Sequence, residues 1–150
     1  MLQLQRVSTE HPDFLRLVAL LDQDLAERDG EAHVFYAPHN HLTHIHQVVL
    51  ALWAGMPVGC GAIRPFDETS AEMKRMYVLP EHRRRGIAAA VLRELELWAA
   101  ESGCSRCVLE TGKNQPEALA LYRKSGYRRM PNYGPYAQID NSVCLEKSLG

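Results

Sequence analysis

A basic segment at the start of a predicted helix could bind phosphate groups. In "YVLPEHRRRGIAAAV", three arginines and a glycine follow an apolar run, and a helical pattern then begins at Ile87. The first turn of a helix offers unpaired backbone N–H groups and the positive end of the helix dipole, which favour a bound phosphate. Arginines add charge-assisted hydrogen bonds, and a glycine lets a ligand approach the backbone closely. We therefore predict a diphosphate site at Arg83, Arg84, Arg85 and Gly86, with a solvated basic loop as the alternative.

The two most common nucleotide-binding motifs are missing. Neither G-x-G-x-x-G nor G-x-x-x-x-G-K-[ST] occurs in the chain. Dinucleotide-binding sites of the Rossmann type and P-loops depend on these glycines, so the predicted phosphate site is of another kind.

Two further groups of side chains could do metal or redox chemistry. Cys104 and Cys107 form a C-x-x-C pair, but the pair follows a helix instead of beginning one, and no second pair exists. We therefore interpret these cysteines as buried apolar residues. The stretch "HNHLTHIH" holds four histidines whose spacing matches no standard zinc motif, so we interpret them as surface residues, with a loop beside a substrate site as the alternative. These are His39, His41, His44 and His46.

Hydrophobic periodicity predicts a chain of alternating strands and helices. A first helix carries apolar residues from Phe14 to Leu25 and ends at Gly30, and residues 31–44 could hold another helix. Two strand-like runs are joined by "AGMP", which is typical of a hairpin. The predicted strands are 2–7, 46–53, 57–66, 71–78, 107–111, 127–130 and 142–149, and the later helices are 87–101 and 116–126. Since no repeat or linker is visible, we predict one α/β domain over residues 1–150.

Composition narrows the function classes. The 150 residues carry a net charge of -1, with 46% apolar and 23% charged residues. This composition is typical of a globular protein, and a net charge so close to zero argues against a general nucleic-acid binder. The arginine cluster therefore matters locally or not at all. No apolar run approaches the roughly 20 residues of a membrane span, and the N-terminus lacks the pattern of a signal peptide. We expect a cytoplasmic protein without a membrane or nucleic-acid partner.

The segments "EMKRMYVLPEHRRRGIAAAVLRELELWA" and "CVLETGKNQPEALALYRKSGYR" together resemble the GNAT superfamily of acetyl-CoA-dependent N-acyltransferases. The family pattern Q/R-x-x-G-x-G/A is matched by Arg83, Gly86 and Ala88. A second pattern, N-x-x-A-x-x-L-Y-x-K-x-G-F, is matched by Ala118, Leu121, Tyr122, Lys124, Gly126 and Tyr127. The asparagine of that pattern falls on Gln115, with Asn114 one position earlier, so we expect either amide to contact the cofactor.

The resemblance implies a fold and a cofactor site. It implies a mixed, mostly antiparallel central sheet, flanked by helices and splayed between its fourth and fifth strands. Acetyl-CoA would enter this splay as a co-substrate, without a metal, and pair with the backbone of the fourth strand. By register, that backbone belongs to Met76, Tyr77 and Val78, while the diphosphate would lie on Arg83 to Ala88, including Ile87.

The resemblance also implies catalytic roles for three residues. Tyr122 stands where the family places its general acid, with a packed helix tyrosine as the alternative. Glu72 lies eleven positions before Arg83, where one branch of the family carries its base, although "AEMKRM" alternates as a strand with one solvent-facing side would. Glu110, at the end of the fifth strand, is the second candidate for the base. A general base is needed because a protonated amine has no lone pair with which to attack.

The implied activity is transfer of an acetyl group from acetyl-CoA to a primary amine of a small molecule or peptide. We expect direct attack in a ternary complex, because no Cys/His pair indicates an acyl-enzyme. The loop "PNYGPYAQIDN", with Tyr133, Tyr136 and Asp140, would cover the acceptor side. The alternative is an acyl-CoA sensor without turnover, and a homodimer is compatible with either.

Overall fold

The structure is a computed structural model that describes residues 1–29, 45 and 47–150. Its centre is a seven-stranded sheet in the order β1-β2-β3-β4-β5-β7-β6. All neighbouring strands are antiparallel except β4 and β5, which are parallel. The strands are β1 (Leu2–Val7), β2 (Gln47–Trp53), β3 (Met56–Asp67), β4 (Ser70–Val78), β5 (Arg106–Gly112), β6 (Arg128–Met130) and β7 (Ser142–Ser148).

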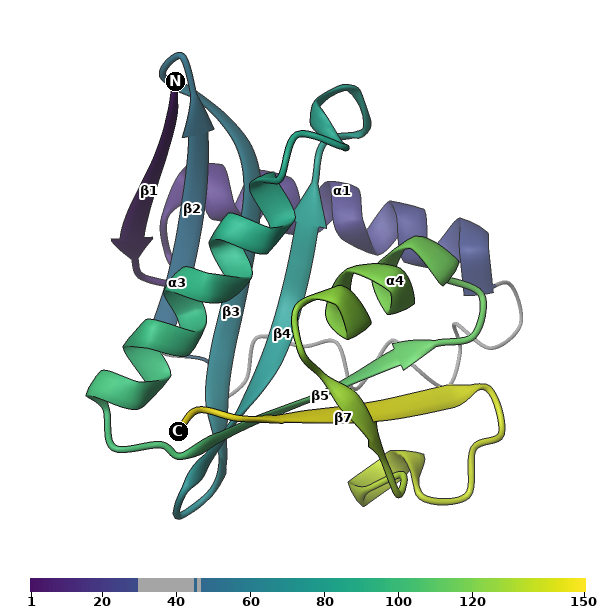
Figure 1. Cartoon of the computed structure of the whole chain (residues 1–150). Coiled ribbons are helices and arrows are strands. Elements are labelled where there is room, and N and C mark those ends of the chain that lie inside the picture. The colour runs from purple at the N-terminus through teal and green to yellow at the C-terminus, as the bar shows by residue number, and fades with distance from the viewer. Residues whose placement is uncertain (30–44, 46) are drawn as a thin grey trace.

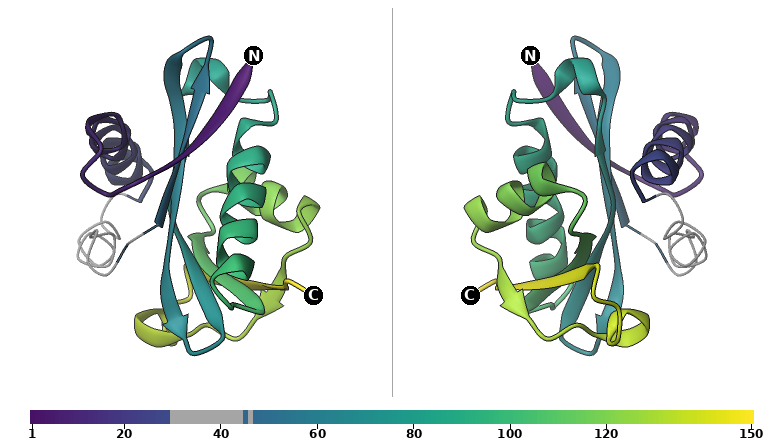
Figure 2. Two further views of the ribbon diagram at one scale, coloured as in Figure 1. Left: turned by 90° about the vertical axis from the view of Figure 1, so that its left-hand side faces the viewer. Right: turned by 90° about the vertical axis from the view of Figure 1, so that its right-hand side faces the viewer.

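Helices cover both faces of the sheet. Helix α1 lies on one face, and α3 and α4 lie on the other (Figures 1 and 2). The bounds are α1 (Pro12–Asp29), α3 (Ile87–Glu101) and α4 (Pro116–Lys124), with short 3-10 turns η3 (Pro80–His82) and η4 (Gly134–Tyr136). The predicted α/β fold with a mostly antiparallel sheet is thereby confirmed, and the strands lie within a residue or so of their predicted positions.

Each face of the sheet has its own hydrophobic core. Under α1, Phe14 and Leu21 pack on Leu50 and Tyr77, and the larger cluster under α3 includes Leu92 and other buried residues. Burial of apolar surface on both sides, at about 25 cal/mol per Å², holds the three layers together. Since most strands are covered on both faces, their burial does not alternate, and β4 is buried at seven of its nine positions.

The backbone conformation at three positions explains where the chain turns between β2 and β3 and where α4 and α3 begin. The β2–β3 hairpin turns over Ala54 and Gly55, which both have positive φ (51° and 82°), as a two-residue turn matched to the twist of the strands requires. Helix α4 begins at Pro116, whose missing N–H costs nothing at the first helical position. Before α3, Gly86 has φ 78° and turns the chain from the η3 loop into the helix.

Candidate active site

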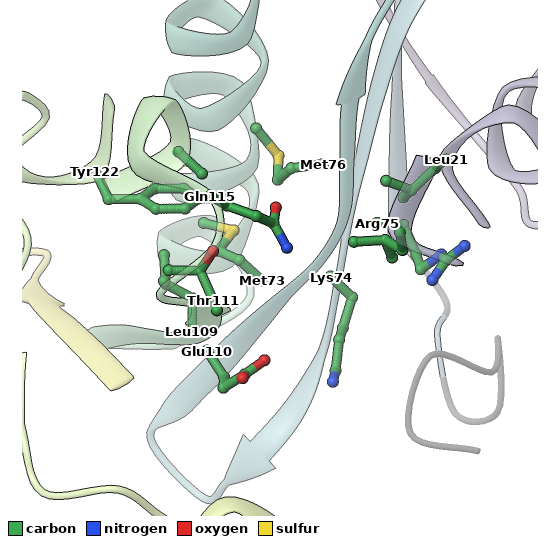
Figure 3. Close-up of a pocket in the computed structure, with 13 residues that line it drawn as sticks. Leu21, Met73, Lys74, Arg75, Met76, Leu109, Glu110, Thr111, Gln115 and Tyr122 are labelled. Carbon is green, nitrogen blue, oxygen red and sulfur yellow. The ribbon is translucent and has the colours of Figure 1, made fainter. Parts of the chain in front are cut away.

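A cleft opens where β4 and β5 diverge. The two strands pair only over Ser70–Glu72 and Arg106–Val108, and beyond these positions they separate (Figure 1). A cavity of about 110 Å³ occupies the gap (Figure 3). Its walls are Leu21, Leu25, Met73, Lys74, Arg75, Met76, Leu109, Glu110, Thr111, Gly112, Gln115, Ala118 and Tyr122. The splay between the fourth and fifth strands is therefore present as predicted.

A β-bulge in β4 determines which side chains reach each side of the cleft. Ala62 of β3 pairs with Lys74 and Cys60 pairs with Tyr77, so Arg75 and Met76 together oppose Gly61. Arg75 has φ 60°, unusual for a residue with a side chain, and its carbonyl accepts a hydrogen bond from Cys60 Sγ at 3.4 Å. Because of the extra residue, Lys74 and Arg75 both lie on the α1 face.

The face of the cleft toward α4 is apolar apart from a few polar groups. Met73 and Leu109 belong to the core under α3, and Met76 lies so close to Gly61 that a side chain there would collide with its sulfur. Tyr122 of α4 is 7% exposed and directs its ring toward the cavity, beside Gln115 (Figure 3). Burial, with a smaller contribution from the charge of Glu110, raises the pKa of the Tyr122 phenol. The phenol is therefore protonated at neutral pH.

The face of the cleft toward α1 is charged. Lys74 of β4 and Glu110 of β5 extend into the same part of the gap (Figure 3). Lys74 Nζ donates a hydrogen bond to Tyr136 Oη at 3.2 Å. Burial lowers the pKa of Lys74, while the charges of Glu72 and Glu110 act in the opposite direction. Arg75 is 6% exposed and forms an ion pair with Asp22 of α1.

Glu72 is buried beneath the C-terminal loop. Its Oε1 accepts a hydrogen bond from Arg64 Nε at 2.7 Å, and its Oε2 accepts one from Tyr133 Oη at 2.8 Å. Lys74 Nζ lies 3.6 Å from the same Oε2. Glu72 is only 1% exposed, so the alternative that this position is a solvent-facing strand residue is wrong. It does not line the cavity, whereas Glu110 does.

The start of α3 has the geometry of an anion site. Gly86 adopts φ 78°, and a Cβ built on it would meet no atom within 4 Å. Arg84 and Arg85 beside it are exposed, and Arg84 has φ 66°. The first helical turn, from Ile87 through Ala88, has no acidic residue that would repel an anion. Backbone N–H groups, an open glycine and exposed guanidinium groups therefore meet at one place, as phosphate binding requires.

The three predicted arginines differ in their contacts. Arg83 turns back onto the sheet, where its Nε donates a hydrogen bond to the Val78 carbonyl at 2.8 Å and its guanidinium lies 5.5 Å from the Tyr77 ring centre. Arg85 lies 5.4 Å from the ring centre of Trp53. Arg83 thus fixes the end of β4 to the loop, whereas the other two guanidinium groups face solvent.

A profile of the Acetyltransferase (GNAT) family matches residues 12–127. This chain belongs to that family. An IAA acetyltransferase from Azospirillum brasilense is 34% identical over 143 residues, which cover 90% of each chain. The GNAT assignment makes the protein an acyltransferase and supports acetyl-CoA as its co-substrate, so the predictions of an enzyme and of its acyl donor are confirmed.

Solved structures agree with this assignment. A protein from Klebsiella pneumoniae, proposed to be an acyl-CoA N-acyltransferase, superimposes with a TM-score of 0.83 at 30% identity, covering 100% of this chain and 99% of that one. A GNAT acetyltransferase from Elizabethkingia anophelis, solved with acetyl-CoA bound, has a TM-score of 0.72 at 20% identity, with 98% and 97% coverage. The second likeness is one of fold alone.

The residues of this GNAT chain fit acetyl-CoA as a ligand. Gly86 leaves open space where a phosphate would approach the backbone, and the edge of β4 beyond Glu72 faces the cleft instead of β5. Of the two predicted amides, Gln115 lines the cavity, while Asn114 is exposed in the loop before α4. In the described part of the chain, no helix is long and apolar enough to cross a membrane.

Several side chains of the cleft were missed by the sequence analysis. Lys74, Arg75 and Thr111 line the cavity but match no motif. The spacing of Glu72 and Lys74, two positions apart on one strand, could have indicated a charged pair on one face. No local signal marks the bulge at Arg75, since a positive φ is common only for glycine and asparagine.

Two other predictions concern the acceptor side. Tyr133 and Tyr136 of the C-terminal loop do pack against the strands beside the cleft, with their ring centres 5.9 Å apart, whereas Asp140 lies at the far end of that loop.

His39, His41, His44 and His46 lie outside the described residues. Among residues 1–29, 45 and 47–150, no group of three or more His, Cys, Asp or Glu side chains is arranged to hold a metal ion.

Proposed function

We propose that this GNAT enzyme transfers an acetyl group from acetyl-CoA to a primary amine while both substrates are bound. The observation that carries the proposal is a single cavity with a protonated phenol, Tyr122, on one side of the sheet and a carboxylate, Glu110, on the other. A proton donor for the leaving group and a proton acceptor for the nucleophile are the two groups that aminolysis of a thioester needs.

The donor would bind along β4 and the start of α3. Acetyl-CoA supplies an activated acyl group and a thiol leaving group. We infer that the backbone of Met76, Tyr77 and Val78 orients the donor, and that Arg84, Arg85 and the N–H groups after Gly86 hold its diphosphate. Backbone N–H groups at the splay would also stabilise negative charge that develops on the carbonyl oxygen.

Glu110 is the stronger candidate for the general base. It lines the cavity from the β5 side, so an acceptor in the gap can reach it. Both oxygens of Glu72 already accept hydrogen bonds, from Arg64 and from Tyr133, and Glu72 does not line the cavity. We therefore infer that Glu110 removes the proton from the amine and that Glu72 positions Lys74 and Tyr133.

Tyr122 would protonate the departing thiolate. Its hydroxyl has a raised pKa because the residue is buried, so the proton is present at neutral pH. It forms no hydrogen bond to another side chain in the described part of the chain, which leaves the proton available to a ligand. Its ring is held by an edge contact with Tyr127, with the centres 5.9 Å apart.

Direct attack is favoured over a cysteine acyl-enzyme. All four cysteines of the chain are free thiols, and none lines the cavity. Burial raises the pKa of Cys60 and of Cys107 to about 12, and that of Cys144 to about 11. A thiol with so high a pKa is a poor source of the thiolate nucleophile.

The test is turnover with a panel of amines, including amino acids, polyamines, aminoglycosides and peptides with a free N-terminus. We expect acetylated amine by mass spectrometry and equimolar free coenzyme A thiol, with intersecting initial-velocity lines. Parallel lines, or labelled protein after incubation with acetyl-CoA alone, would indicate an acyl-enzyme. Donor binding without any product would favour the sensor alternative.

We further propose that residues 1–150 act as one catalytic domain in the cytoplasm, with no nucleic-acid partner. Four free cysteines suit a reducing compartment, and a net charge of -1 gives no general attraction to a polyanion.

A further inference from the structure

The α1 side of the cleft presents two consecutive cations opposite a carboxylate. In a regular strand, neighbouring side chains point to opposite faces, but the bulge places both Lys74 and Arg75 on the α1 face of β4. Glu110 of β5 lines the same cavity as Lys74 and Arg75. Lys74 and Glu110 extend into the gap, whereas the guanidinium group of Arg75 points toward α1 (Figure 3). A site that needed only to attract a cationic amine would not carry two cations.

Arg75 has a hydrogen-bond donor that the protein does not satisfy. Its Nη2 donates to Asp22 and lies 3.5 Å from the Val18 carbonyl, so its charge is compensated on the α1 side. Its Nε is buried and has no acceptor in the described part of the chain. A buried N–H without a partner is unfavourable, and a ligand oxygen would provide the missing acceptor.

Lys74 shares its carboxylate partner, Glu72, with other donors. Its side chain is 10% exposed, and the hydroxyl of Tyr136 and a carboxylate oxygen of Glu72 lie beside its Nζ, at 3.2 and 3.6 Å. The Glu72 carboxylate also bonds to Arg64 and Tyr133, so its charge is shared among several donors. An additional anion at the cleft would therefore be attracted to Lys74.

We propose that the acceptor is an amino acid, whose carboxylate binds Lys74 and the Nε–H of Arg75 while its amine faces Glu110. The cations of the cleft then face the carboxylate of the acceptor, and the carboxylate of Glu110 faces its amine. This inference rests on the proposed amine acetylation and names its substrate class.

The test compares matched pairs of acceptors. A series of α-amino acids and the amines formed by their decarboxylation differ only in the carboxylate. We expect kcat/KM of the wild-type enzyme to be at least about 10²-fold higher for the amino acids, because removing an anion leaves buried donors unsatisfied. Most of the difference is expected in KM, since the carboxylate does not take part in the chemistry.

Two variants assign the preference to residues. Lys74→Met should reduce the preference to about tenfold or less. Arg75→Lys keeps the charge next to Asp22 but loses the Nε–H, and should reduce the preference by a smaller factor. Lys147→Met is the matched control, because Lys147 is also part-buried and ion-paired, with Glu96 at 2.9 Å, but lies outside the cavity. It should keep the full preference.

The outcomes separate this inference from the proposed function. Equal acetylation of amino acids and their decarboxylated amines would overturn the inference and leave amine acetylation standing. A preference that survives in both folded variants would overturn the assignment to Lys74 and Arg75. Acetylation of no member of either series would overturn both proposals. If Lys74→Met does not fold, Arg75→Lys carries the same test.

Discussion

The two sides of the cleft are built from the same two strands, yet they differ in chemistry. Toward α4, Met73, Met76 and Leu109 form an apolar wall around the phenol of Tyr122. Toward α1, Lys74 and Glu110 form a charged wall. An apolar wall suits an acyl group and a phenol that must keep its proton, and a charged wall suits an amine that must lose one. In the proposed mechanism, the two faces of the sheet would therefore separate two opposite proton transfers.

The largest effect is expected for the phenol on the α4 side. Tyr122→Phe keeps the ring and its packing but removes the proton, so kcat should fall by roughly 10²-fold or more while the affinity for acetyl-CoA changes little. Steady-state kinetics and calorimetry measure the two quantities. The matched control is Tyr127→Phe, because Tyr127 is also buried but its hydroxyl donates a hydrogen bond to Glu96 at 2.9 Å. It should lose about 1 kcal/mol of stability and keep kcat. Equal activity of Tyr122→Phe and wild type would assign Tyr122 to packing alone.

A smaller effect is expected for the carboxylates on the α1 side. Glu110→Gln should lower kcat/KM by roughly 10- to 10²-fold, most strongly at low pH, where free amine is scarce.

Glu72→Gln should keep the wild-type pH–rate profile. Its free energy of unfolding should fall by about 1–3 kcal/mol, because Arg64 loses the charge of its partner. The pH profile and a denaturant titration of each variant measure both effects. A changed pH profile in Glu72→Gln alone would exchange the two roles.

A side chain added at the donor end of the cleft, at the start of α3, should weaken the binding of acetyl-CoA by about tenfold. Gly86→Asn adds a side chain in the open space before α3, and asparagine tolerates the left-handed backbone that φ 78° demands. The control is Gly103→Asn, at a similar φ of 95° after α3, also in open space but far from the cleft. Calorimetry should show weaker binding (~1.4 kcal/mol) only for the first variant. Equal affinity in both would remove the start of α3 from the donor site.

Alkaline pH should lower the melting temperature of the protein by a few degrees, because buried tyrosines lie on both faces of the sheet. Burial raises the pKa of Tyr122 on the α4 side and of Tyr133 on the α1 side above that of a free phenol. A group whose pKa is raised by folding contributes stability below its unfolded pKa, about 10 for tyrosine, and loses it as pH rises above that value. Melting curves from neutral to alkaline pH, read with tyrosinate absorbance, should show the loss. An unchanged melting temperature above pH ~10 would contradict the burial of these phenols.

The sequence predicted the secondary-structure elements better than the contacts on the charged side of the cleft. Periodicity located the strands and helices, and Gly86 marked the start of α3, because these signals are local. The burial of Glu72 depends on Tyr133, which is 61 positions later in the chain, and on Arg64 of the neighbouring strand. The alternation in "AEMKRM" indicated an exposed face because nothing nearby in the sequence shows what covers it.

The bulge at Arg75 was also beyond sequence reasoning. A regular strand would place Lys74 and Arg75 on opposite faces, and only the pairing with β3 shows the extra residue. The charged wall therefore follows from tertiary structure, whereas the family motifs that surround it are read directly from the sequence.

The narrow seam between β4 and β5 has a consequence for the motions of the molecule. Three residue pairs join these strands, whereas seven join β5 to β7. Backbone amides along the seam should therefore exchange with solvent deuterium sooner than those between β5 and β7, because few hydrogen bonds must break for the two halves of the sheet to part. A ligand that bonds to both strands would replace the missing ladder, so substrates should slow this exchange and join the halves into one cooperative unit.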